Sequence, residues 1–306
     1  MLVQKMNDKC KRAWYTGITN LPPLLQTARK GPRNPRPKGR KRKEISAMNK
    51  SFYFNGLRLW VQGLLLLFLR WSQMKTGFDP ATGLSRQSVP GTVLAAAILV
   101  LAAAEAVFAF RAPGGKRTYS NCLAPFSQGH LPLLAAGSLL LAAGSVLLPG
   151  WGPLEITAAA GGICTAAGLI LFARIVRSGG DVKVFQLLPA MIFSVVFLLE
   201  IYLPEEGNPV LARYYLPVLS AALIACFFYQ LAGLVLREGK LRWLVFFGNL
   251  SVPLALASMA DCAGNLGRTL VYFGFALVTT IFLLLRRDEV LPEPEAEEDG
   301  EENSEN

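Results

Sequence analysis

Three long apolar stretches follow one another in the first half of the chain, at 91–110, 131–149 and 154–176. Each repeats a run of small residues after seven positions: Ala135-Ala136-Gly137-Ser138, for example, returns as Ala142-Ala143-Gly144-Ser145. Seven residues are close to two turns of an α-helix, so the small residues lie along one side of each helix. Small residues let helix backbones approach closely in lipid, where hydrophobic attraction between helices is weak. We therefore expect these stretches, within residues 91–176, to form a tightly packed, left-handed three-helix bundle inside a membrane.

The composition is typical of a membrane protein. Of the 306 residues, 52% are hydrophobic and 17% are charged, which is fewer charged residues than a soluble domain usually carries. The formal net charge of +10 comes from one end of the chain. Residues 1–47 hold 13 of the 31 Lys and Arg residues and two acidic residues, whereas ten of the 21 acidic residues follow Arg287. The basic character therefore belongs to an amino-terminal arm and not to the body of the chain.

The two ends of the chain have the composition of disordered segments. Residues 1–50 are rich in proline and basic residues, and 288–306 is an acidic tail. A basic arm next to a membrane helix can bind anionic lipid or nucleic acid, or simply mark the cytoplasmic side; we expect a lipid partner and no nucleic-acid partner. Because Lys43-Glu44 can be encoded by a bacterial ribosome-binding sequence shortly before Met48, we also hypothesise that translation starts at Met48.

A fourth apolar stretch, 54–71, lies before the three small-residue stretches and is bracketed by Arg58 and Arg70. A helix of this length reaches about 27 Å, just enough to cross a hydrocarbon core of roughly 30 Å if the arginines extend toward the headgroups. The alternative is an amphipathic helix that lies in the membrane interface. The stretch is therefore either the first transmembrane helix or an interfacial one.

The second half of the chain, 184–285, is predicted to form a four-helix bundle rich in aromatic residues. Its apolar stretches cover 184–203, 211–236, 241–260 and 268–285. Three of them contain a proline: Pro189, Pro217 and Pro253. Because an internal proline removes a helical hydrogen bond, we expect this bundle to be kinked and looser than the first.

The fold class that follows is all-α, a polytopic membrane protein with eight transmembrane helices, or seven plus one interfacial helix. With eight spans, the loops on one side hold eleven Lys and Arg residues, leaving aside the segment before the first span, and those on the other side hold five. Cytoplasmic loops carry the excess of positive charge. This distribution predicts a multi-pass protein of the cell membrane with both termini in the cytoplasm.

One loop carries a resemblance. The sequence Phe78-Asp79-Pro80-Ala81-Thr82-Gly83-Leu84 has the composition of a turn, begun by Asp-Pro and closed by Thr-Gly. It resembles a phrase of uncharacterised bacterial multi-pass membrane proteins. The resemblance covers only this loop and the general hydropathy, so it implies a bacterial membrane protein and no particular activity.

The residue inventory argues against the common catalytic sites. His130 is the only histidine, so zinc sites of the His-Glu-x-x-His kind, which need two, are excluded. We also expect no serine or cysteine triad that uses this histidine. No phosphate-binding loop or dinucleotide fingerprint occurs, and the five cysteines are scattered without a Cys-x-x-Cys pair. We expect no catalytic residue, no metal site and no cofactor.

Charged residues at the ends of the apolar stretches are the remaining signal, because ionisable groups are costly in a membrane. Glu200 and Arg213 flank one loop, and Asp261 and Arg268 flank another. Antiparallel helices should bring the members of each pair to a similar depth. The pattern predicts either a polar outer mouth, lined also by Tyr214, that binds a small polar solute, or two ion pairs that merely pin helix hairpins.

Two further polar residues lie deeper in the predicted helices. Glu105 is next to the alanine repeat of its helix, where it is either bonded to a neighbouring helix or coupled to proton movement. Asn249 lies near Ser251 and Pro253, which suits a ligand site of the kind that transporters build at broken helices, or local satisfaction of a freed carbonyl. Our first hypothesis is a non-enzymatic sensor, scaffold or accessory subunit that binds another membrane protein. The alternative is a small-solute transporter with a site among the helices of 184–285.

Overall fold

The computed structural model describes residues 38–79, 88–111, 119–124, 126, 129–148, 150, 152–180, 182–205 and 214–286. Side chains are described from residue 54 onward, except those of Asn121 and Glu205. Most of the basic arm, the acidic tail, Arg213 and the larger part of the 78–84 loop lie outside these residues. The chain divides into two compact units, and the account below concerns the second, Ser51–Asn306.

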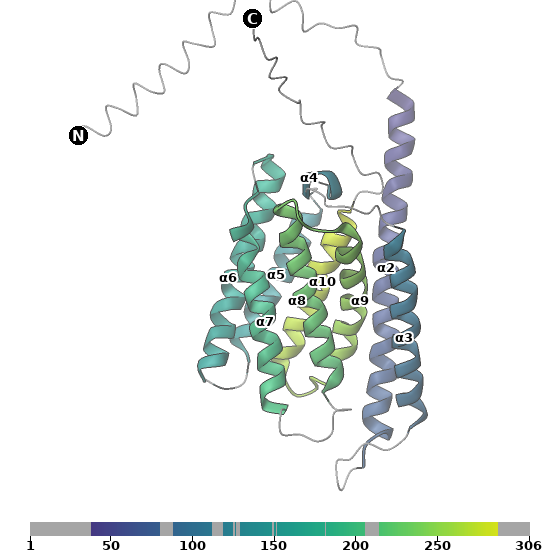
Figure 1. The fold of residues 1–306 in the computed structure, drawn as a ribbon, viewed down its shortest axis with the longest axis vertical. Helices are drawn as coiled ribbons and strands as arrows, with labels where there is room; N and C mark the ends of the chain where they lie inside the picture. Colours follow the sequence, from purple (N-terminus) through teal and green to yellow (C-terminus); the bar gives the residue numbers. More distant parts are fainter. Residues whose placement is uncertain are drawn as a thin grey trace, which may run out of the picture. The chain divides into compact units, whose positions relative to one another are not determined.

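The described part of the chain is helical, and Leu123 and Arg286 form an isolated β-bridge. Successive long helices run in opposite directions (Figure 1). The long helices are α2 Lys38–Thr76, α3 Val89–Phe110, α5 His130–Val146, α6 Pro153–Ser178, α7 Leu188–Tyr202, α8 Tyr215–Val235, α9 Leu241–Ser258 and α10 Leu266–Leu284. The short elements are α4 Tyr119–Cys122, η2 Val184–Gln186 and η3 Leu203–Glu205.

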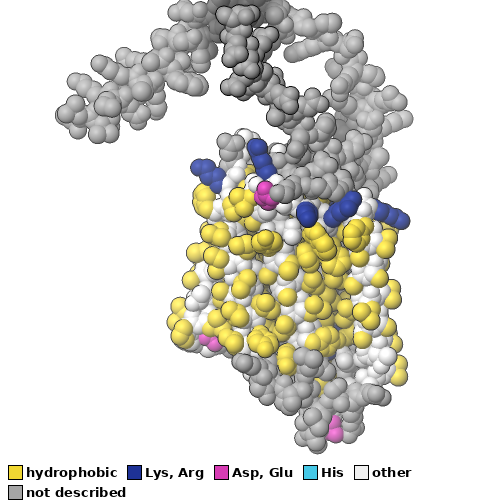
Figure 2. Space-filling view, in the orientation of Figure 1, with side chains coloured by type: hydrophobic (Ala, Val, Ile, Leu, Met, Phe, Trp, Pro, Cys, Tyr) yellow, Lys and Arg dark blue, Asp and Glu magenta, His cyan; other side chains and the backbone are white. Residues whose placement is uncertain are grey.

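Six helical segments are long and apolar enough to cross a membrane: α3, α6, η2 with α7, α8, α9 and α10. The shorter α5 is also apolar, whereas α2 is not among the six because Arg58 and Arg70 lower its mean hydropathy. Figure 2 shows a wide band of hydrophobic side chains around the bundle, with Lys and Arg gathered at the end where α4 lies, hereafter the α4 end. The chain is a membrane-embedded, multi-pass helical protein.

The order of packing differs from the expected three-helix bundle of residues 91–176. Helix α5 packs between α10 and α6, α7 lies between α6 and α8, and α9 contacts α8 and α10. Helix α3 packs on α9, on another part of the bundle. The small residues of α5 and α6 are therefore used to bring α5 against α10 as well as α6.

The backbones of α5 and α10 approach each other closely. A Cβ atom added to Gly144 would lie 2.8 Å from the carbonyl oxygen of Gly267, and one added to Gly274 would lie 2.9 Å from the carbonyl oxygen of Gly137. The two glycines of α10 are seven residues apart, as are those of α5, so antiparallel helices place each glycine against its counterpart. Two matched glycine repeats thus let the two backbones touch.

The aromatic half of the chain forms the centre of the bundle. In α9, 78% of the apolar span is buried, against 22% in α3. Six phenylalanines from α7, α8 and α10 are completely buried: Phe193, Phe197, Phe227, Phe228, Phe275 and Phe282. Large aromatic side chains fill the space between these helices. That the second bundle is looser than the first stays a prediction.

The three prolines of this bundle differ in their place along the helices. Pro189 lies in the first turn of α7 and Pro217 is the third residue of α8, where the backbone N–H groups have no helical acceptor in any case. Only Pro253 lies inside a described helix of the second half, α9. The prediction of three kinking prolines was therefore wrong for two of them.

The glycine repeat yields a stability prediction. Gly144→Leu should lower the free energy of unfolding by about 2 kcal/mol or more, because the new side chain must separate α5 from α10. Ala143→Leu is the matched control, since Ala143 directly precedes Gly144 in the same helix and its side chain is exposed. Thermal unfolding of both purified variants in detergent measures the difference; equal melting temperatures would show that the α5–α10 contact contributes nothing.

Candidate functional site

The first cluster of buried polar groups joins α2, α3 and α9 near the α4 end. Glu105 of α3 has no exposed surface. Arg58 Nη2 of α2 lies 3.0 Å from its Oε1 and donates to its Oε2 at 3.1 Å, and Asn249 Nδ2 of α9 donates to Oε2 at 2.8 Å. Glu105 is thus bonded to two neighbouring helices, and Asn249 serves the carboxylate rather than an open site.

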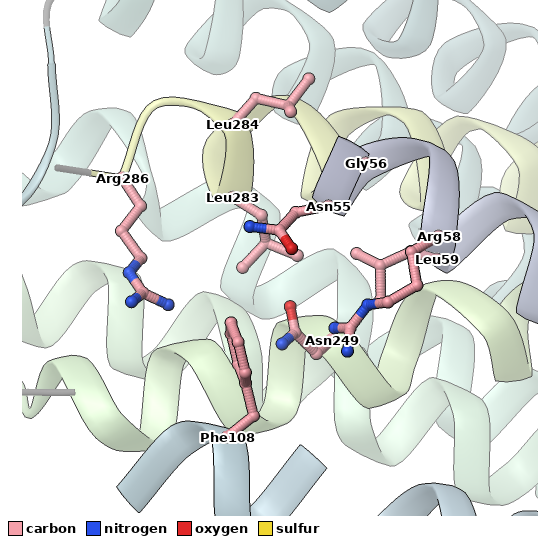
Figure 3. Close-up of a pocket in the computed structure, with 9 residues that line it drawn as sticks. All are labelled: Asn55, Gly56, Arg58, Leu59, Phe108, Asn249, Leu283, Leu284 and Arg286. Atoms are coloured by element: carbon pink, nitrogen blue, oxygen red, sulfur yellow. The ribbon is translucent and has the colours of Figure 1, made fainter. Parts of the chain in front are cut away.

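A small cavity of about 30 Å³ adjoins this cluster. Figure 3 shows Arg58 and Arg286 approaching Phe108, with Asn55 and Asn249 nearby. The guanidinium carbons of Arg58 and Arg286 lie 5.1 and 5.6 Å from the centre of the Phe108 ring. A cavity of this size holds a water molecule and not a metabolite.

The second cluster lies at the opposite end of the bundle and is centred on Arg70. The side chain of Arg70 is completely buried although it comes from α2. Its Nε donates to Asp261 Oδ1 at 2.8 Å, its Nη2 lies 2.6 Å from the same oxygen, and its Nη1 donates to Gln73 Oε1 at 2.8 Å. The guanidinium also lies over the ring of Tyr215 at 5.3 Å. This ion pair ties α2 to the turn between α9 and α10.

The third cluster joins α7 to α10. Arg268 Nη2 donates to Glu200 Oε1 at 2.8 Å, and Nε donates to both carboxylate oxygens at 3.2 Å. Glu200 is almost fully buried, whereas a quarter of the Arg268 side chain is exposed. Asn265 caps α10 by accepting a hydrogen bond from the Arg268 backbone N–H at 3.0 Å.

The partners differ from those that flanking positions predicted. Glu200 pairs with Arg268, and its expected partner Arg213 lies outside the described residues. Asp261 pairs with Arg70 instead of Arg268. Residues that flank one loop belong to the same helix hairpin, whereas the cations of these ion pairs come from α2 and α10. The two arginines of the 54–71 stretch could have indicated these pairs. If that stretch packs in the bundle, each arginine needs a buried acidic partner.

Three of the predicted mouth residues do lie together. Tyr214, Asp261 and Arg268 line a cavity of about 60 Å³, and Glu200 lies beside it through Arg268. Tyr272 forms another wall, and its hydroxyl donates to the Pro217 carbonyl at 2.9 Å. Ligand sites usually measure roughly 300–1,000 Å³, so this cavity holds ordered water at most in the present conformation.

The turn between α9 and α10 carries two titratable groups beside this cavity. Burial raises the pKa of the Asp261 carboxyl to about 6, against the opposing effect of Arg70, so the group is ionised at neutral pH. Burial also raises the pKa of the Cys262 thiol to about 12, with Asp261 contributing in the same direction. Cys262 is therefore a protonated thiol at neutral pH, which is unreactive.

Among the residues that the structure describes, no three His, Cys, Asp or Glu side chains lie close enough to hold a metal ion. Comparison with protein-family models, with curated proteins and with solved structures gave no match to this chain.

The Arg70 cluster yields a double-mutant prediction. Arg70→Met should lower the free energy of unfolding by about 3 kcal/mol, because Asp261 is then buried without its counter-charge. Combining it with Asp261→Leu should restore most of that loss, since a well-packed apolar pair replaces the ion pair. Unfolding titrations of the two single variants and the double variant measure the coupling. Additive losses would mean that the ion pair does not hold α2 in place.

Proposed function

We propose that this protein is a non-enzymatic subunit of the cell membrane, a sensor, scaffold or accessory subunit, which binds another membrane protein through α3. Two features support the proposal. The buried carboxylates Glu105, Glu200 and Asp261 are all engaged in ion pairs that link helices. The two polar cavities beside them measure about 30 and 60 Å³, which leaves no room for a substrate.

The observation that carries the proposal is the exposed alanine face of α3. The alanine repeat of α3 resembles the small-residue repeats of α5 and α6, yet Ala95, Ala96, Ala103 and Ala104 are exposed. Only 22% of the apolar span of α3 is buried, and the helix packs on α9. Small residues on a membrane helix favour close contact with another helix, so this face suits a partner from outside the described chain.

The proposed topology has eight spans, with α2 and α5 added to the six apolar helices. Contacts along α2 support its crossing. Gly56 lies against Leu284, Trp60 Nε1 donates to Thr280 at 3.2 Å, Gly63 lies against Leu256, and Arg70 pairs with Asp261. These contacts follow α9 and α10 from one end to the other, which an interfacial helix could not do.

The charge distribution supports an orientation with both termini in the cytoplasm. The ends of α3, α6, α8 and α10 and the start of α9 lie at the α4 end (Figure 1). In and beside these helix ends are Arg111, Arg174, Arg177, Lys183, Arg237, Lys240, Arg242 and Arg286. At the other end, Arg70 and Arg268 are neutralised by buried carboxylates. The positive-inside rule then places the α4 end in the cytoplasm.

A small-solute transporter is the second candidate, favoured by the meeting of Tyr214, Asp261 and Arg268 around one cavity. Transport would require a second conformation in which Glu200 separates from Arg268 and the cavity widens. A small polar solute that raises the melting temperature of the native chain, but not that of Glu200→Gln, would favour this candidate.

The binding role of α3 can be tested by enlarging its exposed alanines. Ala96→Leu combined with Ala103→Leu should disrupt the complex extracted from native membranes, because the new side chains block close helix contact. Ala136→Leu with Ala143→Leu is the matched control: these alanines are also exposed and seven residues apart, but lie on α5. Native gel electrophoresis reports the complex, and thermal unfolding of the purified chain should be unchanged in both variants.

Two outcomes would contradict this function. One is a wild-type chain that leaves native membranes as a monomer. The other is a complex that survives the α3 double variant, or is lost equally in the α5 control.

A further inference from the structure

A large apolar cleft lies between α3 and α9 at the α4 end. Its volume is about 550 Å³, in the range of sites that bind small molecules. One wall is formed by the small residues Ala106 and Ala109 of α3, and Phe110 lies at the end of that helix. The other wall is formed by Trp243 and Phe246 of α9. The cleft exists because two alanines face two large aromatic side chains without filling the space between the helices.

The aromatic wall is held in place by neighbouring rings. The Trp243 ring stacks on Phe247 with centroids 5.7 Å apart and meets Phe246 edge-on at 6.0 Å. Phe246 in turn meets Phe247 at 5.4 Å. A fixed, apolar wall of this kind suits a flexible hydrocarbon chain, which gains dispersion contacts without ordering the protein.

Two basic residues lie at the polar end of the cleft. Among the residues that the structure describes, Lys240 and Arg242 are the charged ones that line it. Lys240 is the N-cap of α9 and Arg242 lies in the first turn, which contains no acidic residue and no side-chain cap hydrogen bond. The positive end of the helix dipole adds to the two cations, so this rim attracts an anion.

We infer that this cleft binds an anionic phospholipid, with the phosphate group at Lys240 and Arg242 and an acyl chain between Ala106 and Trp243. A soluble anion would leave the apolar walls unused, and a zwitterionic lipid would gain less from the two cations. The acidic tail after Arg287 has few apolar residues with which to fill the cleft. The lipid site lies at the end of α3, beyond Ala96 and Ala103, and the variants that test it leave both of these alanines unchanged.

Native mass spectrometry of the full-length chain tests this inference, with phosphatidylglycerol and phosphatidylcholine as the probes. The wild-type chain should retain phosphatidylglycerol more strongly than phosphatidylcholine. Lys240→Gln combined with Arg242→Gln should weaken phosphatidylglycerol binding about 25-fold, since each cation near an anionic headgroup contributes about fivefold. Ala106→Phe should weaken binding of both lipids by filling the cleft.

The control removes two cations elsewhere at the same end of the bundle. Arg177→Gln with Lys183→Gln changes the net charge equally but lies on α6 and the loop that follows it, and both residues are exposed. This variant should bind phosphatidylglycerol as the wild type does. Equal loss in both double variants would mean non-specific attraction to surface charge. Equal retention of the two lipids, or equal stabilisation by glycerol phosphate alone, would also overturn the inference. Melting temperatures of all variants exclude unfolding as the cause.

Discussion

A buried arginine has to be neutralised, because an unpaired charge in an apolar environment costs several kcal/mol. Arg70 meets this requirement at one end of α2 through Asp261 and Gln73, and Arg58 meets it toward the other end through Glu105. The two arginines that make α2 a poor membrane helix by composition are thus what attach it to the bundle. These pairs add to the contacts of Gly56 and Gly63 with α10 and α9 in holding the least apolar of the long helices.

The rest of the bundle is held by two kinds of packing. Glycines at matched intervals let α5 and α10 touch along their backbones, as at Gly144 and Gly267. Phenylalanines fill the space between α7, α8 and α10, where Phe193 stacks on Phe275 with centroids 5.6 Å apart. Helix α3 takes part in neither: it is anchored by Glu105 and its contact with α9, which leaves its alanines available to a partner and leaves a cleft at its end.

Much of the fold could be predicted from sequence, because neighbouring residues alone specify a long apolar helix or a turn with Gly or Pro. The glycine repeat of α5 was evident, but its partner in α10 was missed because Gly267 and Gly274 are separated by aromatic residues rather than by small ones. The ion-pair partners were also missed. Arg70 and Asp261 are 191 positions apart, and no local pattern specifies which acid a distant arginine will meet. Three residues of the predicted outer mouth, Tyr214, Asp261 and Arg268, do line one cavity. They lie together because the ends of neighbouring helix hairpins reach the same depth in the bundle.

The most direct test of this account is whether the end of α2 at Thr76 and the α4 end of the bundle lie on opposite sides of the membrane. Single cysteines at Thr76 and at Lys183, in a chain without its native cysteines, can be labelled with a membrane-impermeant maleimide. If α2 crosses the membrane with its arginines paired inside the bundle, Thr76→Cys is labelled in intact cells and Lys183→Cys only after permeabilisation. The reverse pattern would contradict the account, because it would place the α4 end outside the cell.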